Sequence, residues 1–346
     1  MIKQRIDSSK PIAVVILNWN GSELLPQYLP SVIKYTDPDL ADIIVADNGS
    51  TDNSLAILTQ FEEHIKVISW SDNLGFAAGY NKAINLVNHP YILLLNSDIR
   101  VTPHWLSPLY QFIVTRPDVV SVQPTIRWEK EPNRFEYAGA LGGYVDKLGY
   151  PFCRGRIFST LEYDTGQYGQ EPQEVFWTSG ACMLVRRELY INTGGLEESF
   201  FAHQEEIDLC WRWGAQHYKL YAIPASVVYH QGGASLSVKN PRKTYLNFRN
   251  NLCMLSRNLP VTKRRKVIMV RFFLDALAAI VFLCSGNPKD AKAVFKAWKD
   301  FYKYPSPPVT TGCKDAAYKR LYPKSVLYRY YICQEKTYQQ LKKKPL

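Results

Sequence analysis

The sequence predicts an α/β fold: an open, doubly wound, mostly parallel sheet flanked by helices, followed by a helical, basic C-terminal extension. Three observations support this prediction. Short apolar runs alternate with helical patterns over residues 1–125. Three of these runs end in clusters of Asn, Asp, Gly and Ser. After about residue 241 the pattern becomes helical and strongly basic.

The expected strands are short apolar runs. They cover residues 12–17, 43–46, 66–70, 91–95, 119–122, 182–185 and 225–229. The helices expected between the first five strands cover residues 22–35, 53–62, 77–88 and 103–115. Pro103 suits the first turn of the last of these, and a further helix opens near Glu205. Residues 129–175 lack periodicity, so we expect an irregular segment that covers one side of a ligand site.

Charge divides the chain into two parts. Residues 1–240 hold 19 Lys and Arg against 26 Asp and Glu, whereas residues 241–346 hold 23 against 5. We expect an α/β domain over 1–240, with halves at about 1–125 and 126–240, and a basic helical region over 241–346. A basic region behind an acidic body suggests an anionic partner such as a membrane surface. A solvated basic face explains the charge equally well.

The most hydrophobic stretch is 267–284, which Arg271 and Asp275 interrupt. Because it barely reaches the length of a bilayer span, we do not expect it to cross a membrane. With the basic residues 263–266 it would suit a membrane interface, so residues 261–346 are a candidate for peripheral membrane contact. The alternative is a helix packed on the preceding domain, where stripes of Leu, Phe and Val are usual.

Other features of the sequence favour a cytoplasmic protein that does not bind nucleic acid. The first ten residues contain no apolar run, so we expect no secretory signal peptide. The seven cysteines are odd in number and lack the spacing of a zinc site, which indicates reduced thiols. No module that interleaves basic and aromatic residues is recognisable, which argues against nucleic acid as a partner.

Polar residues at the strand ends predict a ligand site, because ligands of open α/β sheets bind beyond the carboxyl ends of the strands. Asp98, in the segment 96–98, can hold Mg²⁺ or Mn²⁺ next to a diphosphate. Asp47 can accept the imino N–H of a pyrimidine or bind a ribose hydroxyl. The alternative for such an Asp is a simple turn residue, which is the commoner role.

The segment 73–81 leads into the third helix. At Gly75 the backbone can approach a ligand closely, and the start of the helix favours anions. No G-x-G-x-x-G follows the first strand, which counts against a nicotinamide-dependent dehydrogenase.

Three carboxylates open the helix near residue 205. Asp208 and Arg212 are four residues apart and are expected to pair. Glu205 or Glu206 can then face the site as a general base for a hydroxyl group. The alternative is that both only stabilise the helix start. His230, at the end of the last strand, can complete a metal site or contact phosphate.

Taken in order, these residues resemble the inverting glycosyltransferases of family 2, which have the GT-A fold, and most of all their rhamnosyltransferase-type members. The matching segments are 14–20, 44–50, 73–76, 96–98, 178–181, the pair Glu205-Glu206 and His230. The resemblance extends over roughly residues 12–235.

The resemblance implies roles for single positions. Asp47 would contact the donor base. The other expected donor-binding residues are Asn18, Asn20, Asn73, Gly75, Asn81, Asn96 and Ser97. The expected acceptor-binding residues are Trp177, Thr178, Ser179 and Gly180. Asp98 takes the last position of the family's metal-binding Asp-x-Asp, in which Asn96 replaces the first Asp, and His230 matches a position associated with metal and diphosphate.

The implied reaction is a single displacement with inversion. The family's base is usually the second acid of a Glu-Asp pair, a position that Glu206 holds here, and the longer side chain leaves Glu205 as an alternative. With Mg²⁺ or Mn²⁺, a rhamnose-like or other hexose would move from a dTDP- or UDP-sugar to a glycan or lipid-linked glycan. The expected setting is cell-surface polysaccharide synthesis in the cytoplasm, at the inner face of the plasma membrane.

Two alternatives remain open at this point. A nucleotidyltransferase that makes nucleotide-sugars can share a similar sheet, but it typically carries a Gly-rich loop with Arg or Lys, which residues 18–21 lack. A non-catalytic nucleotide-sugar-binding module would tolerate replacement of both Glu205 and Glu206. The sequence does not separate thymidine from uridine donors, since both present the same imino edge to Asp47.

Overall fold

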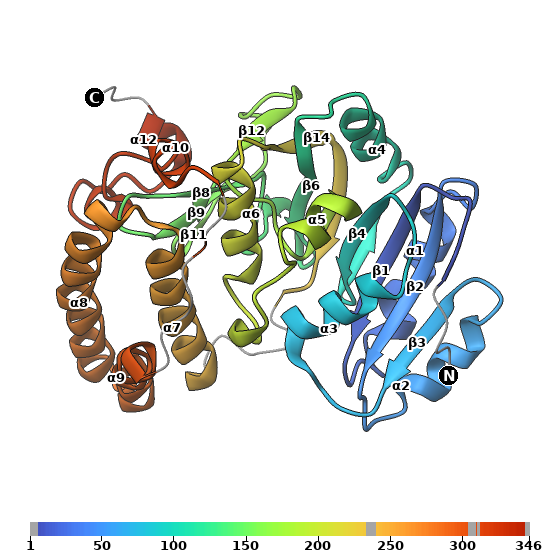
Figure 1. Cartoon of the computed structure of the whole chain (residues 1–346), viewed down its shortest axis with the longest axis horizontal. Coiled ribbons are helices and arrows are strands. Elements are labelled where there is room, and N and C mark those ends of the chain that lie inside the picture. The colour runs from blue at the N-terminus through green and yellow to red at the C-terminus, as the bar shows by residue number, and fades with distance from the viewer. Residues whose placement is uncertain (1–5, 233–239, 304–308, 310–311, 343–346) are drawn as a thin grey trace.

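The computed structural model describes residues 6–232, 240–303, 309 and 312–342. Its main sheet has ten strands (Figure 1). From one edge to the other they run β12 (Gln173–Val175), β14 (Lys219–His230), β6 (Val119–Trp128), β13 (Cys182–Arg186), β4 (Tyr91–Asn96), β1 (Ile12–Asn18), β2 (Ala41–Asn48) and β3 (Lys66–Trp70). Of the other two, β5 (Ile99–Val101) pairs with β14 and β7 (Glu131–Phe135) pairs with β6.

The sheet is mostly parallel, as predicted. Strands β1 to β4 are parallel to their neighbours in this group, and β6 is parallel to β14. The exception in the middle is β13, which is antiparallel to both β4 and β6. Each predicted strand is present, and several are longer than their apolar runs.

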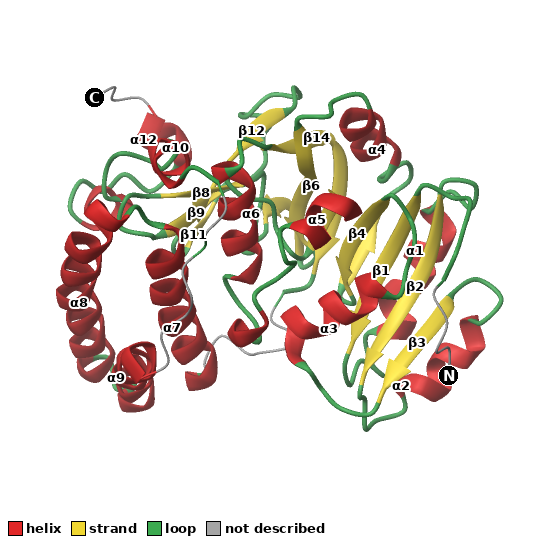
Figure 2. Ribbon diagram, viewed as in Figure 1, coloured by secondary structure: helices red, strands yellow, loops and turns green. Residues whose placement is uncertain are grey.

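Helices cover both faces of the sheet (Figure 2). On one face lie α1 (Leu25–Tyr35), α2 (Ser54–Leu58), which a 3₁₀ turn follows, and α4 (Ser107–Val114). On the other face lie α3 (Gly75–Asn85), α5 (Arg187–Asn192) and α6 (Glu205–Ala215). Strand β1 explains the two layers, because Val14 packs with the first group and Val15 with the second. The doubly wound arrangement is therefore confirmed.

Two local expectations were wrong. Helix α4 begins at Ser107, so Pro103 precedes the helix and is not in its first turn. Residues 129–175 are not irregular: besides β7 and β12 they form a small antiparallel sheet. Its strands are β8 (Gly143–Val145), β9 (Pro151–Cys153), β10 (Arg156–Ile157) and β11 (Thr160–Leu161). Strands of two or three residues are too short to show a hydrophobic period.

The region after residue 240 is helical, as expected. Its helices are α7 (Pro241–Asn258), α8 (Val261–Cys284), α9 (Pro288–Lys303), α10 (Lys314–Lys319), α11 (Val326–Tyr331) and α12 (Tyr338–Lys342). Helix α7 packs against α6, and α8 is the outermost helix at the left of Figure 1. The predicted pair of Asp208 with Arg212 is present at 2.9 Å, and Asn258 of α7 donates to the other oxygen of Asp208 at 2.7 Å. The domain division at residue 240 stays a prediction.

A buried ion pair fixes α8. Arg271 and Asp275 are 3.1 Å apart and almost fully buried, and Arg271 also donates to the carbonyl of Leu148 at 3.0 Å. Asp275→Leu leaves the guanidinium without its counter-charge, so it should lower the free energy of unfolding by about 3–5 kcal/mol in urea titrations.

The double replacement Arg271→Met with Asp275→Leu removes both charges and should recover part of this loss. A single variant within about 0.5 kcal/mol of the parent chain would contradict the proposed role of the ion pair.

Candidate active site

The carboxyl ends of three strands meet at one edge of the sheet. Asn18 at the end of β1 lies opposite Asp47 of β2, and Leu17 lies opposite Asn96 of β4. The parallel pairing therefore brings together side chains that are far apart in the sequence. A ligand site beyond these strand ends stays a prediction, and this edge is where it would lie.

Asp47 and Asn18 belong to one buried network. The Asn18 amide donates to Asp47 at 2.9 Å, and the Ser50 hydroxyl donates to the same carboxylate oxygen at 2.6 Å. The backbone N–H of Ser50 donates to the other carboxylate oxygen at 3.0 Å. Asn20, with a left-handed φ of 51°, accepts from the backbone N–H of Thr51 at 2.7 Å. The loop after β2 is thus held against the loop after β1.

Asn48 also shapes the site, although the sequence analysis did not single it out. Its amide oxygen accepts from the Trp70 indole at 2.6 Å and from the backbone N–H of Leu74 at 3.1 Å. Its amide nitrogen donates to Asn73 at 3.1 Å. Asn48 therefore ties β2 to the turn that leads into α3. Its position directly after Asp47, at the end of an apolar run, is the feature of the sequence that could have identified it as a site residue.

The start of α3 packs against the chain just before α6. Gly75 has a φ of 83°, and a Cβ there would lie 2.5 Å from the ring of Phe201. The backbone N–H groups of Phe76 and Ala77 donate to the Phe201 carbonyl at 2.7 and 3.3 Å. Asn81, farther along α3, is bound to the loop after α5 through the backbone of Leu196. The backbone N–H groups at the start of α3 and the side chain of Asn81 therefore already have hydrogen-bond partners within the protein.

Asp98 and His230 lie side by side. Antiparallel pairing sets Ile99 of β5 opposite His230 of β14, and the Asp98 carboxylate is 3.0 Å from Nε2 of His230. Nδ1 of His230 lies 3.2 Å from the buried carboxylate of Glu136, which the sequence analysis missed because it falls in 129–175. Burial alone would lower the pKa of His230, but the carboxylates of Asp98 and Glu136 raise it well above its ordinary value.

Asp98 offers a carboxylate oxygen of the kind that Mg²⁺ and Mn²⁺ prefer, whereas both ring nitrogens of His230 already face carboxylates. No group of three or more His, Cys, Asp or Glu in the described part of the chain is arranged as a metal cage. Mg²⁺ and Mn²⁺ at diphosphate sites need only one or two protein ligands, because phosphate and water supply the others. The Asn96 amide, 3.5 Å from His230, adds a polar group at the same place.

Residues 177–180 lie just before β13. Trp177 is buried and donates from its indole to the carbonyl of Tyr144 at 3.0 Å. Thr178 and Ser179 are also buried, with side-chain hydrogen bonds of 2.7 Å to Ser121 and 2.5 Å to the carbonyl of Ala138. Gly180 differs from these three, because a Cβ on it would lie 3.5 Å from Glu206. Of the predicted acceptor-binding residues, Gly180 therefore lies next to the predicted base.

Glu205 and Glu206 begin α6 and have strongly shifted pKa values. Burial raises the pKa of Glu206 to about 7. Burial and the neighbouring charge of Glu206 raise the pKa of Glu205 well above its ordinary value. One carboxylate oxygen of each residue is buried without a hydrogen-bond partner. Since buried polar atoms normally have partners, these oxygens mark a place where a ligand can bind.

The chain before the two glutamates is strained. Phe201, His203 and Gln204 have left-handed φ values of 64°, 72° and 74°. Such conformations cost free energy in residues other than glycine and persist only where the surroundings hold them. The buried amide of Asn250 on α7 donates to three carbonyl groups of the segment 200–203 at 2.7–3.0 Å. Helix α7 therefore holds the chain that leads to Glu205 and Glu206.

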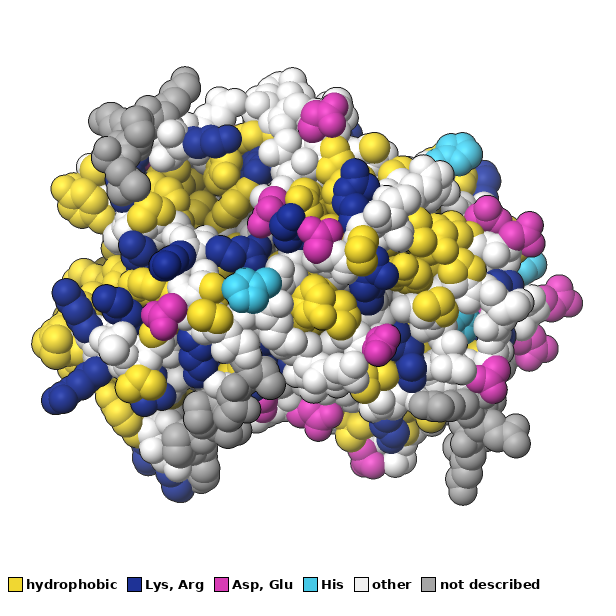
Figure 3. Space-filling model, turned by 45° about the horizontal axis from the view of Figure 1, so that its top comes forward, with side chains coloured by type: hydrophobic (Ala, Val, Ile, Leu, Met, Phe, Trp, Pro, Cys, Tyr) yellow, Lys and Arg dark blue, Asp and Glu magenta, His cyan; other side chains and the backbone are white. Residues whose placement is uncertain are grey.

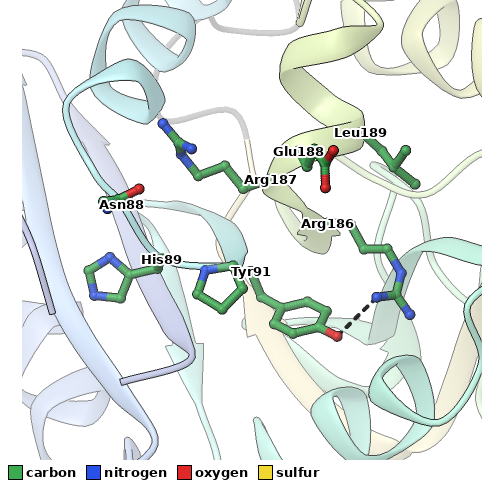
Figure 4. A pocket seen from close by; sticks show the side chains of 8 residues that line it. Asn88, His89, Tyr91, Arg186, Arg187, Glu188 and Leu189 are labelled. Carbon is green, nitrogen blue, oxygen red and sulfur yellow. Dashed lines mark hydrogen bonds between the residues drawn. The ribbon is translucent and has the colours of Figure 1, made fainter. Parts of the chain in front are cut away.

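A cavity of about 360 Å³ lies elsewhere, near the start of β4 (Figure 4). Tyr91, Arg186 and Glu188 are among its lining residues, and none of the predicted site residues is. The Arg186 guanidinium donates hydrogen bonds to the Tyr91 hydroxyl at 3.0 Å and to backbone carbonyls at 2.7–3.0 Å. The predicted site is therefore at the opposite end of the strand from this cavity.

Comparison with known proteins decides the family. The model of "Glycosyl transferase family 2" matches residues 13–194, which is more than half of the chain. The chain belongs to glycosyl transferase family 2. This family 2 glycosyltransferase is 25% identical over 237 residues to the N-acetylglucosaminyl-diphospho-decaprenol L-rhamnosyltransferase of Mycobacterium tuberculosis, covering 63% of this chain and 75% of that one. It is 23% identical over 248 residues to a low-salt glycan biosynthesis hexosyltransferase of Haloferax volcanii, covering 69% and 73%.

Solved structures confirm the GT-A fold of the glycosyltransferase. GalNAc-T7, solved with UDP, GalNAc and Mn²⁺, has a TM-score of 0.58 at 16% identity, covering 88% of this chain and 60% of that one. The mannosyltransferase PcManGT of Pyrobaculum calidifontis, solved with GDP-Man and Mn²⁺, has a TM-score of 0.51 at 12% identity, covering 86% and 76%. Both neighbours were thus solved with a divalent metal ion.

Glu206→Gln should stabilise the glycosyltransferase at alkaline pH. The folded chain holds the Glu206 proton up to about pH 7, whereas an ordinary glutamate loses it near 4.5. The stability that this proton confers is complete below the ordinary pKa and is lost as the pH rises through 7. A neutral Gln avoids the loss, so the variant should gain roughly 1–3 kcal/mol at pH 8.

Thermal unfolding at pH 5 and pH 8 measures this gain, which should largely vanish at the lower pH. Glu188→Gln, on an exposed glutamate of α5, is the matched control and should behave alike at both pH values. An equal gain for Glu206→Gln at both pH values would refute the raised pKa.

Proposed function

We propose that this glycosyltransferase moves a rhamnose-like or other hexose from a dTDP- or UDP-sugar to a hydroxyl group of a glycan or lipid-linked glycan, with inversion. The observation that carries the proposal is Glu206, a carboxylate with a pKa near 7 and an unpartnered oxygen, which packs against Gly180. A base poised near neutral pH is what acceptor activation needs. Cell-surface polysaccharide synthesis at the cytoplasmic face of the plasma membrane is the proposed setting.

The donor would bind along the carboxyl edge of β1, β2 and β4. Asp47, held in position by Asn18 and Ser50, would accept the imino N–H of the pyrimidine. The Oδ1 atom of Asn18 is buried next to Gly21 and has no hydrogen-bond partner in the protein. The other proposed donor contacts are Asn20, Asn73, Gly75, Asn81, Asn96 and Ser97. Asn73, Gly75 and Asn81 also make hydrogen bonds within the protein, which a donor contact would have to share or replace.

Asp98 and His230 would hold Mg²⁺ or Mn²⁺ beside the diphosphate. Bound there, the ion would supply positive charge that stabilises the leaving nucleoside diphosphate. The Asp98 carboxylate would contribute a ligand oxygen, and Glu136 lies 3.2 Å from the other ring nitrogen of His230. The rhamnosyltransferase relative and the two structural neighbours support a sugar donor and a divalent ion as the ligands.

Glu206 would act as the base in one displacement. Its carboxylate takes the proton of the acceptor hydroxyl, whose oxygen forms a bond to the anomeric carbon as the bond to the diphosphate breaks. Attack comes from the face opposite the leaving group, so the configuration inverts. The acceptor would lie over Trp177, Thr178, Ser179 and Gly180, of which Gly180 is next to Glu206.

A transfer assay with a panel of nucleotide-sugars and a lipid-linked glycan acceptor tests the proposal. Glu206→Gln should lower the rate of transfer by about 10²–10⁴-fold and leave donor binding unchanged. Transfer by the parent chain should fall as the pH drops below 7, because the base becomes protonated. The measurements are product formation and isothermal titration with the donor.

Glu205→Gln tests the neighbouring acid, and Glu188→Gln is the control. A larger loss for Glu205→Gln than for Glu206→Gln would move the base to Glu205. Full transfer by both single variants and by the double variant would contradict the proposed chemistry. Donor binding without transfer in the parent chain would favour a binding module.

A further inference from the structure

Helix α8 buries an ion pair and exposes large apolar side chains. Arg271 and Asp275 are 2% and 1% exposed, whereas Phe272 and Phe273 are 50% and 67% exposed. A helix on the surface of a soluble protein normally has the opposite arrangement. Among the described residues, α8 is the one helix that is long and apolar enough to cross a membrane by length and composition.

Specific contacts fix this orientation. Besides its pair with Asp275, Arg271 donates to the side chain of Asn251 on α7 and stacks 4.3 Å from the ring centre of Tyr150. Asp275 accepts from the indole of Trp298 on α9 at 3.1 Å. Turning α8 to bury its apolar side would break these contacts and expose the ion pair. The outward apolar side is therefore built into the fold.

Exposed apolar residues are concentrated on α8 and on α9, which packs against it. They are Met269, Phe272, Phe273, Leu277, Ile280, Val281 and Leu283 on α8, with Phe295 and Tyr302 on the neighbouring α9. The α8 residues recur at spacings of three and four, so they share one side of the helix. Soluble monomers rarely expose large contiguous apolar patches unless a partner covers them.

Basic side chains flank these apolar residues. Lys263, Arg265 and Lys266 are exposed in the first turns of α8. Lys289, Lys292, Lys296 and Lys299 are exposed on α9. Figure 3 shows dark blue and yellow side chains together on the left edge of the molecule, over this region. Apolar residues edged by lysine and arginine match a bilayer with anionic headgroups.

We infer that the outer side of α8 and α9 docks on an anionic lipid bilayer, with α8 lying in the plane of the interface. A second copy of the chain fits this surface less well, because a symmetric contact would bring the same lysines together. A spanning α8 does not fit either, since Arg271 and Asp275 tie its inner side to α7 and α9. An anionic lipid bilayer is therefore the partner that we infer for this surface.

The docking surface is one helix away from the candidate active site. Asn251 of α7 contacts Arg271 of α8 and donates to the side chain of Gln204 at 3.1 Å. Gln204 directly precedes Glu205. Docking would therefore hold the active site near the membrane surface, where a lipid-linked acceptor is presented. The acceptor part rests on the proposed function, whereas lipid docking itself does not.

Co-sedimentation of the full chain with vesicles tests the inference without donor or acceptor. The vesicles are phosphatidylcholine alone, or phosphatidylcholine with about a third phosphatidylglycerol. The parent chain should bind the anionic vesicles much more tightly. The triple variant Lys263→Gln, Arg265→Gln, Lys266→Gln should weaken binding roughly a hundredfold. Phe273→Asp with Leu277→Asp should weaken it by about tenfold or more.

Matched controls use exposed residues outside the C-terminal region. Val114→Asp on α4 controls for the replacement of apolar residues. The control for the loss of charge is a triple variant: Lys34→Gln, Lys82→Gln, Lys130→Gln. Both should bind vesicles like the parent chain. Equal losses in the controls, or no binding by the parent chain, would overturn the inference. Bound chain that resists alkaline carbonate washing would instead mean that α8 enters the bilayer fully.

Sedimentation velocity without lipid tests whether a second copy of the chain, and not a bilayer, covers this surface. A parent dimer that Phe273→Asp converts to a monomer, without vesicle binding, would assign the surface to a second copy. Transfer to a water-soluble acceptor should be unchanged in the α8 variants. Vesicle binding without any transfer would therefore leave the docking surface standing while the proposed function fails.

Discussion

The hydrogen bonds from the Asn250 amide to the segment 200–203 are the contact on which the rest of the site depends. They hold a chain with three left-handed residues that would otherwise relax. The same segment provides the Phe201 carbonyl that binds the start of α3, and it leads directly to Glu205 and Glu206. One side chain of the C-terminal region thereby links the start of α3 to the proposed base.

Several features that lower the stability of the fold lie together in the candidate site, and the rest of the structure must offset them. Unpartnered carboxylate oxygens, raised pKa values and left-handed backbone all lie within residues 201–206. The continuous core on both faces of the sheet supplies the stability that permits them. Helix α7 contacts this strained segment on one side and α8 on the other, and α8 carries the exposed apolar surface. The proposed catalytic site and the proposed lipid-docking surface are therefore linked through α7.

Much of the central sheet could be predicted from the sequence, because its strands are apolar runs that end in polar clusters. That pattern predicts one shared sheet edge for Asp47, Asn96 and Asp98, and the register of β1 with β2 and with β4 brings the first two of them to that edge. The small sheet in 129–175 could not be predicted, because its strands are short and carry no hydrophobic period of their own. Glu136 was missed for the same reason. Asn250 was missed because an asparagine in a basic helix gives no local signal of the three carbonyls that it binds.

The most direct test of the central claim is thermal unfolding with UDP and dTDP, with and without Mn²⁺. A ligand at about 100 times its dissociation constant stabilises a protein by about 2.7 kcal/mol, which shifts the melting temperature measurably. The account predicts a shift that requires the metal and that Asp98→Asn abolishes. If neither nucleotide shifts the melting temperature of the folded chain, the strand-end crevice is not a nucleotide-sugar site and the proposed function is wrong.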